Sequence, residues 1–279
     1  IWILLGLGVW IGHFFYWGFN QYITQRALGA KSIKEAQKGV MFAAYLKLLM
    51  PIVIVLPGIC AAILFPVLEK SDQAYPTMMS LLPNGLLGLT FAALIAAIVS
   101  SLASMSNSIS TIFTMDIYRY FKGGEISQSN LIKVGRYTVV ISLLIASLVA
   151  QPLLGSFESI FQYIQNFTGY FSPGIVVIFL VALFWKKATS LSVLIAALIS
   201  LIGSIFISLQ FPDLPFIHRM TLVFLLSAIG CWLTTFLQGY EDQEKAINLN
   251  NMDFSTSKAF NINTFIIVAA LGIIYITLG

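Results

Sequence analysis

The chain has 279 residues, of which 58% are hydrophobic and only 9% charged, and its formal net charge is +4. Soluble globular domains carry about 25% charged residues, so this composition excludes an ordinary soluble domain and predicts an all-α membrane protein. The positive charge does not indicate nucleic-acid binding, because the basic residues lie in short loops between apolar runs, as the positive-inside rule describes.

Eight apolar runs are long enough to cross the hydrocarbon core, which takes about 20 residues of α-helix. Strands are excluded because the runs lack the alternating polar positions of a membrane barrel, and lipid leaves only helices to satisfy the backbone. The runs cover residues 1–23, 39–66, 82–108, 137–154, 159–185, 189–209, 217–238 and 260–278. The first run is already apolar at Ile1, so we expect the upstream part of a longer protein to precede it.

Polar side chains interrupt the first run. His13, Tyr16 and Asn20 are spaced i, i+3, i+7 and would share one face of an α-helix, with Trp17 and Gln21 beside it. We interpret this face as the lining of a cavity. The alternative is an interfacial aromatic belt with polar residues near the helix end. Glycines on both sides of the group would permit an unwound segment.

Lys47 lies inside the second run, where a lysine costs about 2.5–3.5 kcal/mol at the bilayer centre even on a lenient scale. It follows Lys38 by nine residues, or roughly 13 Å of helix, so snorkelling to the interface is awkward but possible. We interpret Lys47 as facing a cavity, with snorkelling as the alternative.

The third run has a row of hydroxyl groups. Ser100, Ser104 and Ser108 are spaced i, i+4, i+8, and the adjacent Ser100 and Ser101 diverge by about 100°. Small residues of this kind commonly serve helix packing in membranes. The alternative is a sodium site, because a hard cation prefers oxygen ligands. Both Ser100 and Ser101 could bind one ion only if it lay in a seam between helices.

Three amides, Gln162, Gln165 and Asn166, open the fifth run, and Pro173 weakens the helix further on. Amides that both donate and accept hydrogen bonds suit a hydroxylated solute, and hydrogen bonding between helices is the alternative. All eleven acidic residues lie in loops or near the ends of runs, which excludes a carboxylate proton relay within this chain.

No catalytic or metal-binding spacing is present in the sequence, so we do not expect an enzyme. Cys60 and Cys231 both lie in apolar runs and are predicted to be packing residues. Residues 240–259 are the most polar stretch and are predicted to form a mobile cytoplasmic loop.

Most basic residues lie in alternate loops, which predicts that these loops are cytoplasmic and that both ends of the chain face outward. Only Lys70 and Arg219 are assigned to the opposite side, and Lys47 lies within a run. The cytoplasmic set is Arg26, Lys31, Lys34, Lys38, Arg119, Lys122, Lys133, Arg136, Lys186, Lys187, Lys245 and Lys258.

Several ordered motifs together resemble the sodium/solute symporter family, and within it the bacterial sodium/galactose (sodium/glucose cotransporter-like) branch. The similarity extends over nearly the whole chain. The motifs are YWGFNQYITQR at 16–26, AKS at 30–32, EAQKG at 35–39, FAAL at 91–94, SSLASM at 100–105 and TMDIY at 114–118.

The resemblance implies a transporter core of two five-helix inverted repeats. Residues 1–185 would be the second repeat, with a broken first helix, and residues 186–279 would add three peripheral helices. The first repeat would lie upstream. The protein would be a multi-pass protein of the bacterial plasma membrane, with Na⁺, a small solute and lipid as its partners, no nucleic acid and no organic cofactor.

The resemblance also assigns roles to individual residues. Tyr16 matches an aromatic inner gate that stacks under the sugar, followed by Trp17, while Lys47 and Gln165 match sugar-binding positions. The Ala97 carbonyl and the Ser100 and Ser101 hydroxyls match sodium ligands. Ser104 matches a polar position near a second ion site in some members. His13 also faces the sugar in this scheme, although the galactose transporters have asparagine there.

These matches imply sodium-coupled symport of a galactose-like or glucose-like sugar by alternating access. The alternative within the family is symport of an amino acid, a carboxylate or a vitamin. Two more distant alternatives are a membrane enzyme that uses His13 and Lys47, and a purely structural bundle.

Overall fold

The computed structural model describes residues 2–154, 159–244, 246–249 and 252–278. Within these ranges every regular element is a helix and no strand occurs. The α-helices are α1 (Trp2–His13), α2 (Gln21–Leu28), α3 (Ile33–Leu48), α4 (Leu56–Leu64), α5 (Ala74–Ser80), α6 (Asn84–Ile112), α7 (Arg119–Lys122), α8 (Gln128–Leu154), α9 (Ile160–Phe184), α10 (Ser190–Gln210), α11 (Phe216–Leu237) and α12 (Lys258–Leu278). Three π-helical segments, η1 (Phe14–Phe19), η2 (Pro51–Val55) and η4 (Phe113–Tyr118), and one 3₁₀ turn, η3 (Ser71–Gln73), join them.

Seven helical segments of the described chain are long and apolar enough to cross a membrane. They are Ile33–Leu64, Asn84–Lys122, Gln128–Ala150, Ile160–Phe184, Ser190–Gln210, Phe216–Leu237 and Lys258–Thr277. The sequence predicts eight, and the additional run at 1–23 is not among the seven. Its helix stops at Phe19, because Asn20 is extended (φ −90°, ψ 115°) before α2 begins. The all-helical membrane class is therefore confirmed, and the count of eight stays a prediction.

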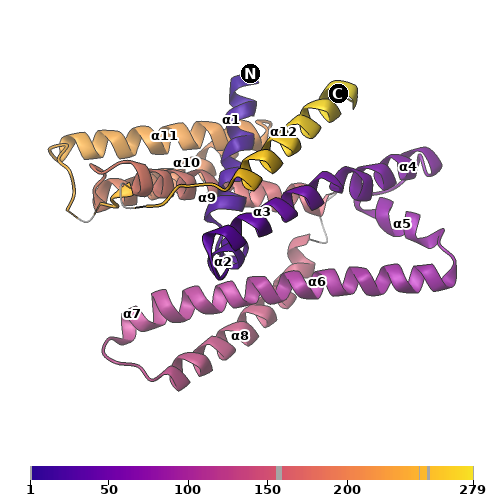
Figure 1. Ribbon diagram of the computed structural model, residues 1–279, viewed down its shortest axis with the longest axis horizontal. Helices are drawn as coiled ribbons and strands as arrows, with labels where there is room; N and C mark the ends of the chain where they lie inside the picture. The colour runs from indigo at the N-terminus through magenta and orange to yellow at the C-terminus, as the bar shows by residue number, and fades with distance from the viewer. Residues whose placement is uncertain (1, 155–158, 245, 250–251, 279) are drawn as a thin grey trace. The chain divides into compact units, whose positions relative to one another are not determined.

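Two compact units make up the chain: residues 1–28 with 161–257, and residues 29–160 with 258–279. In the first unit α10 and α11 run side by side (Figure 1). Helix α1 packs on α11 at Gly8, where a Cβ would overlap the carbonyl oxygen of Ile217. Ile11, Val176 and Met220 join α1, α9 and α11 in one apolar cluster.

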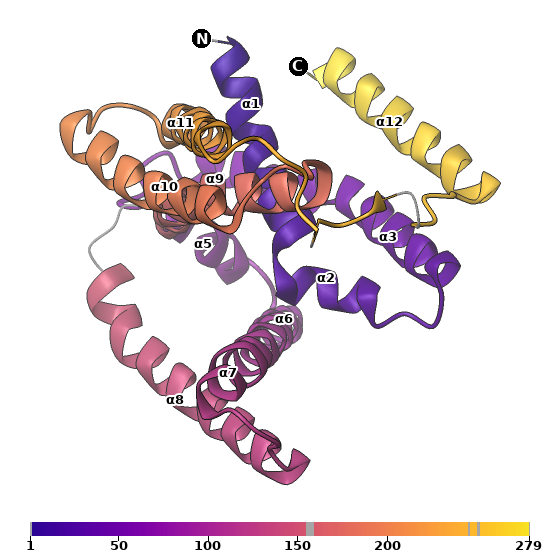
Figure 2. The same ribbon diagram turned by 90° about the vertical axis from the view of Figure 1, so that its left-hand side faces the viewer.

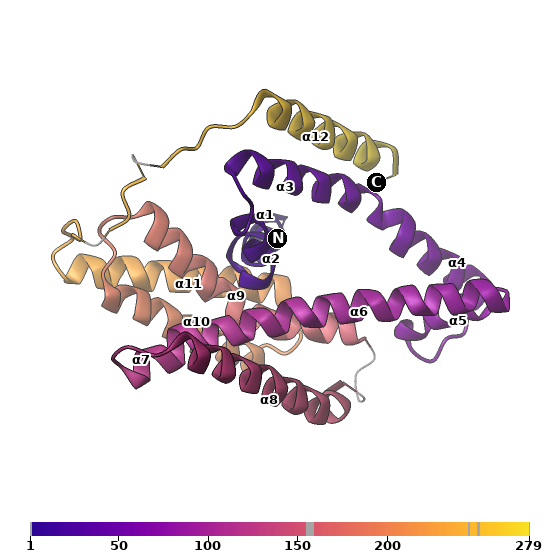
Figure 3. The same cartoon turned by 60° about the horizontal axis from the view of Figure 1, so that its bottom comes forward.

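Two helix pairs of the second unit concern the predicted site residues. Helix α12 lies beside α3 (Figure 2), and the Tyr45 hydroxyl donates a 2.6 Å hydrogen bond to the side-chain oxygen of Asn263 across the pair. Helix α8 lies along α6 (Figure 3). Gly135 of α8 allows a close approach, since a Cβ there would lie 2.6 Å from the Ser110 hydroxyl.

Local sequence explains several helix ends. Ser32 caps α3 by accepting a hydrogen bond from the Glu35 amide at 3.3 Å. Thr189 and Ser192 form a reciprocal capping box at the start of α10. Most of the polar stretch predicted as a loop lies between the end of α11 and the start of α12 and contains no α-helix in its described part, but its last two residues, Lys258 and Ala259, already belong to α12. The two cysteines are free thiols, and Cys231 is buried in the α9–α10–α11 cluster as expected of a packing residue.

Candidate functional site

His13, Tyr16 and Trp17 lie where α1 passes into the π-helix η1. Phe15 and Phe19 of this segment pack inward, and the Phe19 ring stacks on Phe179 of α9 at 4.7 Å. His13, Tyr16 and Trp17 are exposed on the unit. The Tyr16 ring meets the Trp17 ring edge-on at 5.2 Å, and it meets the Tyr22 ring at 6.0 Å.

The shared α-helical face expected for His13, Tyr16 and Asn20 is not formed. His13 ends α1, Tyr16 lies in the π-helix and Asn20 is extended, so the three residues do not follow one 3.6-residue period. The carbonyl oxygen of Asn20 instead accepts hydrogen bonds from the backbone amides of Ile23 and Thr24, and these bonds form the start of α2. π-Helical segments are frequent at functional sites, and here one begins directly after His13.

Lys47 lies in the last turn of α3 and its side chain is exposed on the second unit. Tyr45, two residues earlier, bonds to α12. Two residues correspond to about 200° around an α-helix, so Lys47 lies on the side of α3 that α12 does not cover.

The four residues predicted to bind sodium all lie on α6. Ala97, Ser100 and Ser101 are exposed and Ser104 is half-buried, with its hydroxyl donating to the Ser100 carbonyl at 3.1 Å. Ala97 and Ser101 each precede by nine residues a serine that faces α8, namely Ser106 and Ser110. Nine residues are two and a half turns, so Ala97 and Ser101 lie on the side of α6 opposite to α8.

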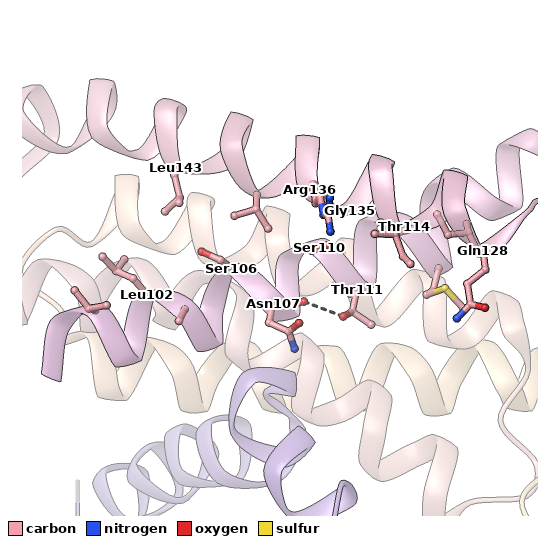
Figure 4. Close-up of a pocket in the computed structure, with 16 residues that line it drawn as sticks. Leu102, Ser106, Asn107, Ser110, Thr111, Thr114, Gln128, Gly135, Arg136 and Leu143 are labelled. Carbon is pink, nitrogen blue, oxygen red and sulfur yellow. Dashed lines mark hydrogen bonds between the residues drawn. The ribbon is translucent and has the colours of Figure 1, made fainter. Parts of the chain in front are cut away.

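The contact between α6 and α8 explains the second hydroxyl row of this helix. An open groove of about 900 Å³ runs along this contact (Figure 4), and it is lined by Ser106 and Ser110 of α6 and by Thr114 of η4. In Figure 4 Ser110 lies next to Gly135 of α8. None of the predicted sodium ligands lines this groove. This row therefore packs against α8. Ala97 and Ser101 on the opposite side are exposed, whereas Ser108, the last serine of the predicted row, is buried.

Gln165 lies in the first two turns of α9 and is exposed on the first unit. The next residue, Asn166, has a different role. Its side-chain oxygen and its backbone oxygen both accept hydrogen bonds from Nη2 of Arg219 in α11, the latter at 3.2 Å. Of the three amides, at least Asn166 therefore serves interhelical hydrogen bonding, which was the alternative interpretation of this group.

Arg219 has a role that its sequence pattern does not reveal. The charge pattern assigns it to the outer side, and in the structure it lies in the first turn of α11 with only 4% of its surface exposed. Its Cζ lies 4.4 Å from the centre of the Tyr170 ring, and its Nη1 donates to the Ser208 hydroxyl at 3.1 Å. A buried arginine in a membrane helix costs about 2.5–3.5 kcal/mol on the lenient scale, which these contacts must offset. No local pattern reveals partners on two other helices; the one signal is an arginine at the third position of the apolar run 217–238.

The predicted residues fall into two groups. His13, Tyr16, Trp17 and Gln165 belong to the first unit, and Lys47 belongs to the second with Ala97, Ser100, Ser101 and Ser104. In each unit they lie on helix faces that the packed neighbours leave open. Such a bundle, with hydroxyl, amide and ammonium groups on open faces of apolar helices, is typical of a polytopic membrane protein of the transport class.

Comparison with known proteins identifies the family. The profile described as the Sodium:solute symporter family matches residues 1–203, so the chain belongs to this family, whose members are transporters and not enzymes. Over 98% of its length the chain is 42% identical to a protein of Vibrio parahaemolyticus named sodium/glucose cotransporter, covering 53% of that protein. The family expected from the motifs is thereby confirmed.

Two further relatives show the range of the family. The human sodium/myo-inositol cotransporter 2 is 38% identical over 64% of this chain and 29% of its own length. An uncharacterized symporter of Escherichia coli is 31% identical over 80% of this chain and 40% of its own length. The chain thus spans about half or less of the curated relatives it matches.

Proposed function

We propose that the full-length protein is a secondary active symporter that couples sodium entry to the uptake of a sugar of the galactose or glucose type. The observation that supports this most directly is the open face of α6. Ala97 and Ser101 lie opposite the side that α8 covers, so their oxygens are available to a cation. The sodium/glucose name of the Vibrio relative supports the choice of both ion and solute.

In this proposal the Ala97 carbonyl and the Ser100 and Ser101 hydroxyls supply part of a sodium site, with Ser104 near a second ion position. A single helix face cannot surround an ion that takes several oxygen ligands, so the remaining ligands come from the part of the protein outside this chain. Sodium binding favours an outward-open state, because the ion has a higher affinity for that state.

The solute site combines His13, Lys47 and Gln165, with Tyr16 and Trp17 below the sugar. The ammonium group of Lys47 and the amide of Gln165 can donate and accept the hydrogen bonds that sugar hydroxyls need. Tyr16 closes the inner side, and rocking of two inverted repeats then exposes the site to the cytoplasm. Residues 1–185 form the second repeat and residues 186–279 the peripheral helices, in a plasma membrane with both chain ends outside. The cycle needs Na⁺ as co-substrate and no organic cofactor.

A second candidate keeps the coupling ion and changes the solute to a carboxylate, an amino acid or a vitamin. Lys47 favours the carboxylate among these, because an ammonium group on an open helix face can pair with an anion. His13 stands where the galactose transporters have asparagine, which also leaves room for a different solute.

Uptake into proteoliposomes that contain the full-length protein tests the proposal. We expect labelled galactose to accumulate under an inward sodium gradient and not when potassium replaces sodium on both sides. Competition then separates the two solutes: excess glucose should block uptake, and excess lactate or alanine should leave it intact. The reverse pattern would favour the second candidate, and sodium-independent uptake would refute coupling.

A further inference from the structure

Arg219 connects three helices of the first unit. Its Nη2 donates to both oxygens of Asn166 in α9, its Nη1 donates to Ser208 in α10, and its guanidinium lies over the ring of Tyr170. The same partners also bind one another, since the hydroxyls of Tyr170 and Ser208 are 2.6 Å apart. These described partners are all electrically neutral.

The position of Arg219 is not explained by the stability of its own helix. It lies in the first turn of α11, where the helix dipole disfavours a cation. Removal from water adds a further cost, since only 4% of its surface is exposed. We therefore explain the buried charge of this residue by the groups that it holds in place. A guanidinium has a rigid, planar set of N–H donors, which can hold two acceptors in a set geometry.

What Arg219 fixes is the first part of α9. From Gly169 to Val177 this helix is mostly buried, and Gly174 approaches α10 so closely that a Cβ would lie 2.6 Å from the Ser200 hydroxyl. Residues 160–167, by contrast, are mostly exposed. Pro173 lies beyond this exposed part and cannot donate to the carbonyl of Gly169, so the helix is weakened between its two parts.

Resting on the proposed function, we propose that Arg219 is a positioning residue for solute binding. By holding both oxygens of Asn166, it sets the direction in which the neighbouring Gln165 presents its amide. Ser204 adds to this restraint by donating to the Tyr170 carbonyl at 3.1 Å. The peripheral helices α10 and α11 thereby take part in solute selectivity without touching the solute.

The first test is sodium-driven uptake of labelled galactose by the full-length protein and its Arg219→Met, Arg219→Lys and Asn166→Ala variants. Loss of a hydrogen bond to a charged group predicts a rise of roughly tenfold in the galactose concentration at half-maximal rate for Arg219→Met. The half-saturating sodium concentration should stay unchanged. Arg219→Lys should not restore galactose affinity, because lysine keeps the charge and loses the fork. Arg119→Met, on the exposed helix α7, is the matched control and should behave as wild type.

A double-mutant cycle separates positioning from general damage. If Arg219 acts through Gln165, then Arg219→Met should change galactose affinity little in the Gln165→Ala background. The proposal would be overturned if the two substitutions raised the half-saturating galactose concentration independently, so that their effects multiply. An equal rise in the half-saturating concentrations of sodium and galactose would also overturn it. If Arg219→Met does not fold, Asn166→Ala takes its place in the uptake measurement, because Asn166 is itself exposed. Its galactose affinity should fall in the same sense, and a wild-type value would also overturn the proposal.

Maleimide labelling does not depend on transport, so it tests the positioning role of Arg219 separately from the symport proposal. In a background with Cys60→Ala and Cys231→Ala, the rate of maleimide labelling at Gln165→Cys reports the position of this part of α9. We expect Arg219→Met to change that rate and to leave the rate at Phe254→Cys, in the polar loop, as it was. An unchanged rate at Gln165→Cys refutes the positioning role. Wild-type uptake that ignores sodium refutes only the symport proposal.

Discussion

Gly135 of α8 and Ser110 of α6 approach so closely that a Cβ on the glycine would lie 2.6 Å from the serine hydroxyl. The same Cβ would lie 3.5 Å from the hydroxyl of Thr114. This contact determines which side of α6 faces α8. Ala97 and Ser101 lie on the opposite side of this helix, and the two sides can therefore be tested separately.

Gly135→Ala should weaken the packing of α6 against α8. An added methyl group in a tight contact costs about 1–3 kcal/mol, so we expect a lower melting temperature of the full-length protein in detergent. Gly272→Ala is the control, because nothing lies within 4 Å of a Cβ at that position of α12. Its melting temperature should stay the same or rise slightly. Equal melting temperatures for the two variants would mean that the α6–α8 contact does not form as described.

The serines of α6 show how far the sequence alone can lead. Spacing drew attention to one row, through Ser100, Ser104 and Ser108, and the structure shows a second row with the same period through Ser106 and Ser110. Periodicity cannot tell which row packs against a neighbour. The glycine that decides this lies in another helix, at position 135, and its partner becomes visible only in three dimensions.

The first run and Arg219 mark two further limits. The prediction of a shared face in the first run assumes an unbroken α-helix. The π-helix that starts at Phe14 has a different number of residues per turn, so the predicted residues no longer share one face. For Arg219, the charge pattern indicates only the side of the membrane and gives no reason to expect a buried guanidinium. Its partners Asn166 and Ser208 lie on helices α9 and α10, and no property of the sequence around Arg219 indicates these contacts.

Lys47→Ala should raise the half-saturating galactose concentration by about tenfold or more, because hydrogen bonds from a charged donor contribute about 1.5–3 kcal/mol each. Uptake at a range of galactose concentrations and saturating sodium measures this. Lys38→Ala on the same helix is the control. Its ammonium group pairs with Glu35 at 2.8 Å on an exposed surface, and such pairs contribute about 0–1 kcal/mol. Unchanged galactose affinity in Lys47→Ala would assign Lys47 to snorkelling.

The 279-residue chain alone should not transport galactose. Under the proposed function it supplies only part of the sodium site and part of the solute site, consistent with its coverage of 53% of the Vibrio relative. Proteoliposomes with this chain should show the same galactose uptake as protein-free liposomes, whereas those with the full-length protein should show sodium-driven uptake. Robust sodium-driven uptake by the chain alone would refute the division of the sites.

The separation of ion and solute sites is tested most directly by paired titrations of Ser101→Ala and Gln165→Ala in the full-length protein. We expect Ser101→Ala to raise the half-saturating sodium concentration by about tenfold and to leave sugar selectivity intact, if an oxygen contact to the ion is worth as much as a hydrogen bond to a charged group. Gln165→Ala should weaken galactose binding and leave sodium dependence intact. Ser106→Ala, on the α8 side of the same helix, should alter neither. Equal losses of sodium and galactose affinity in both variants would contradict the assignment of Ser101 to sodium and Gln165 to the solute.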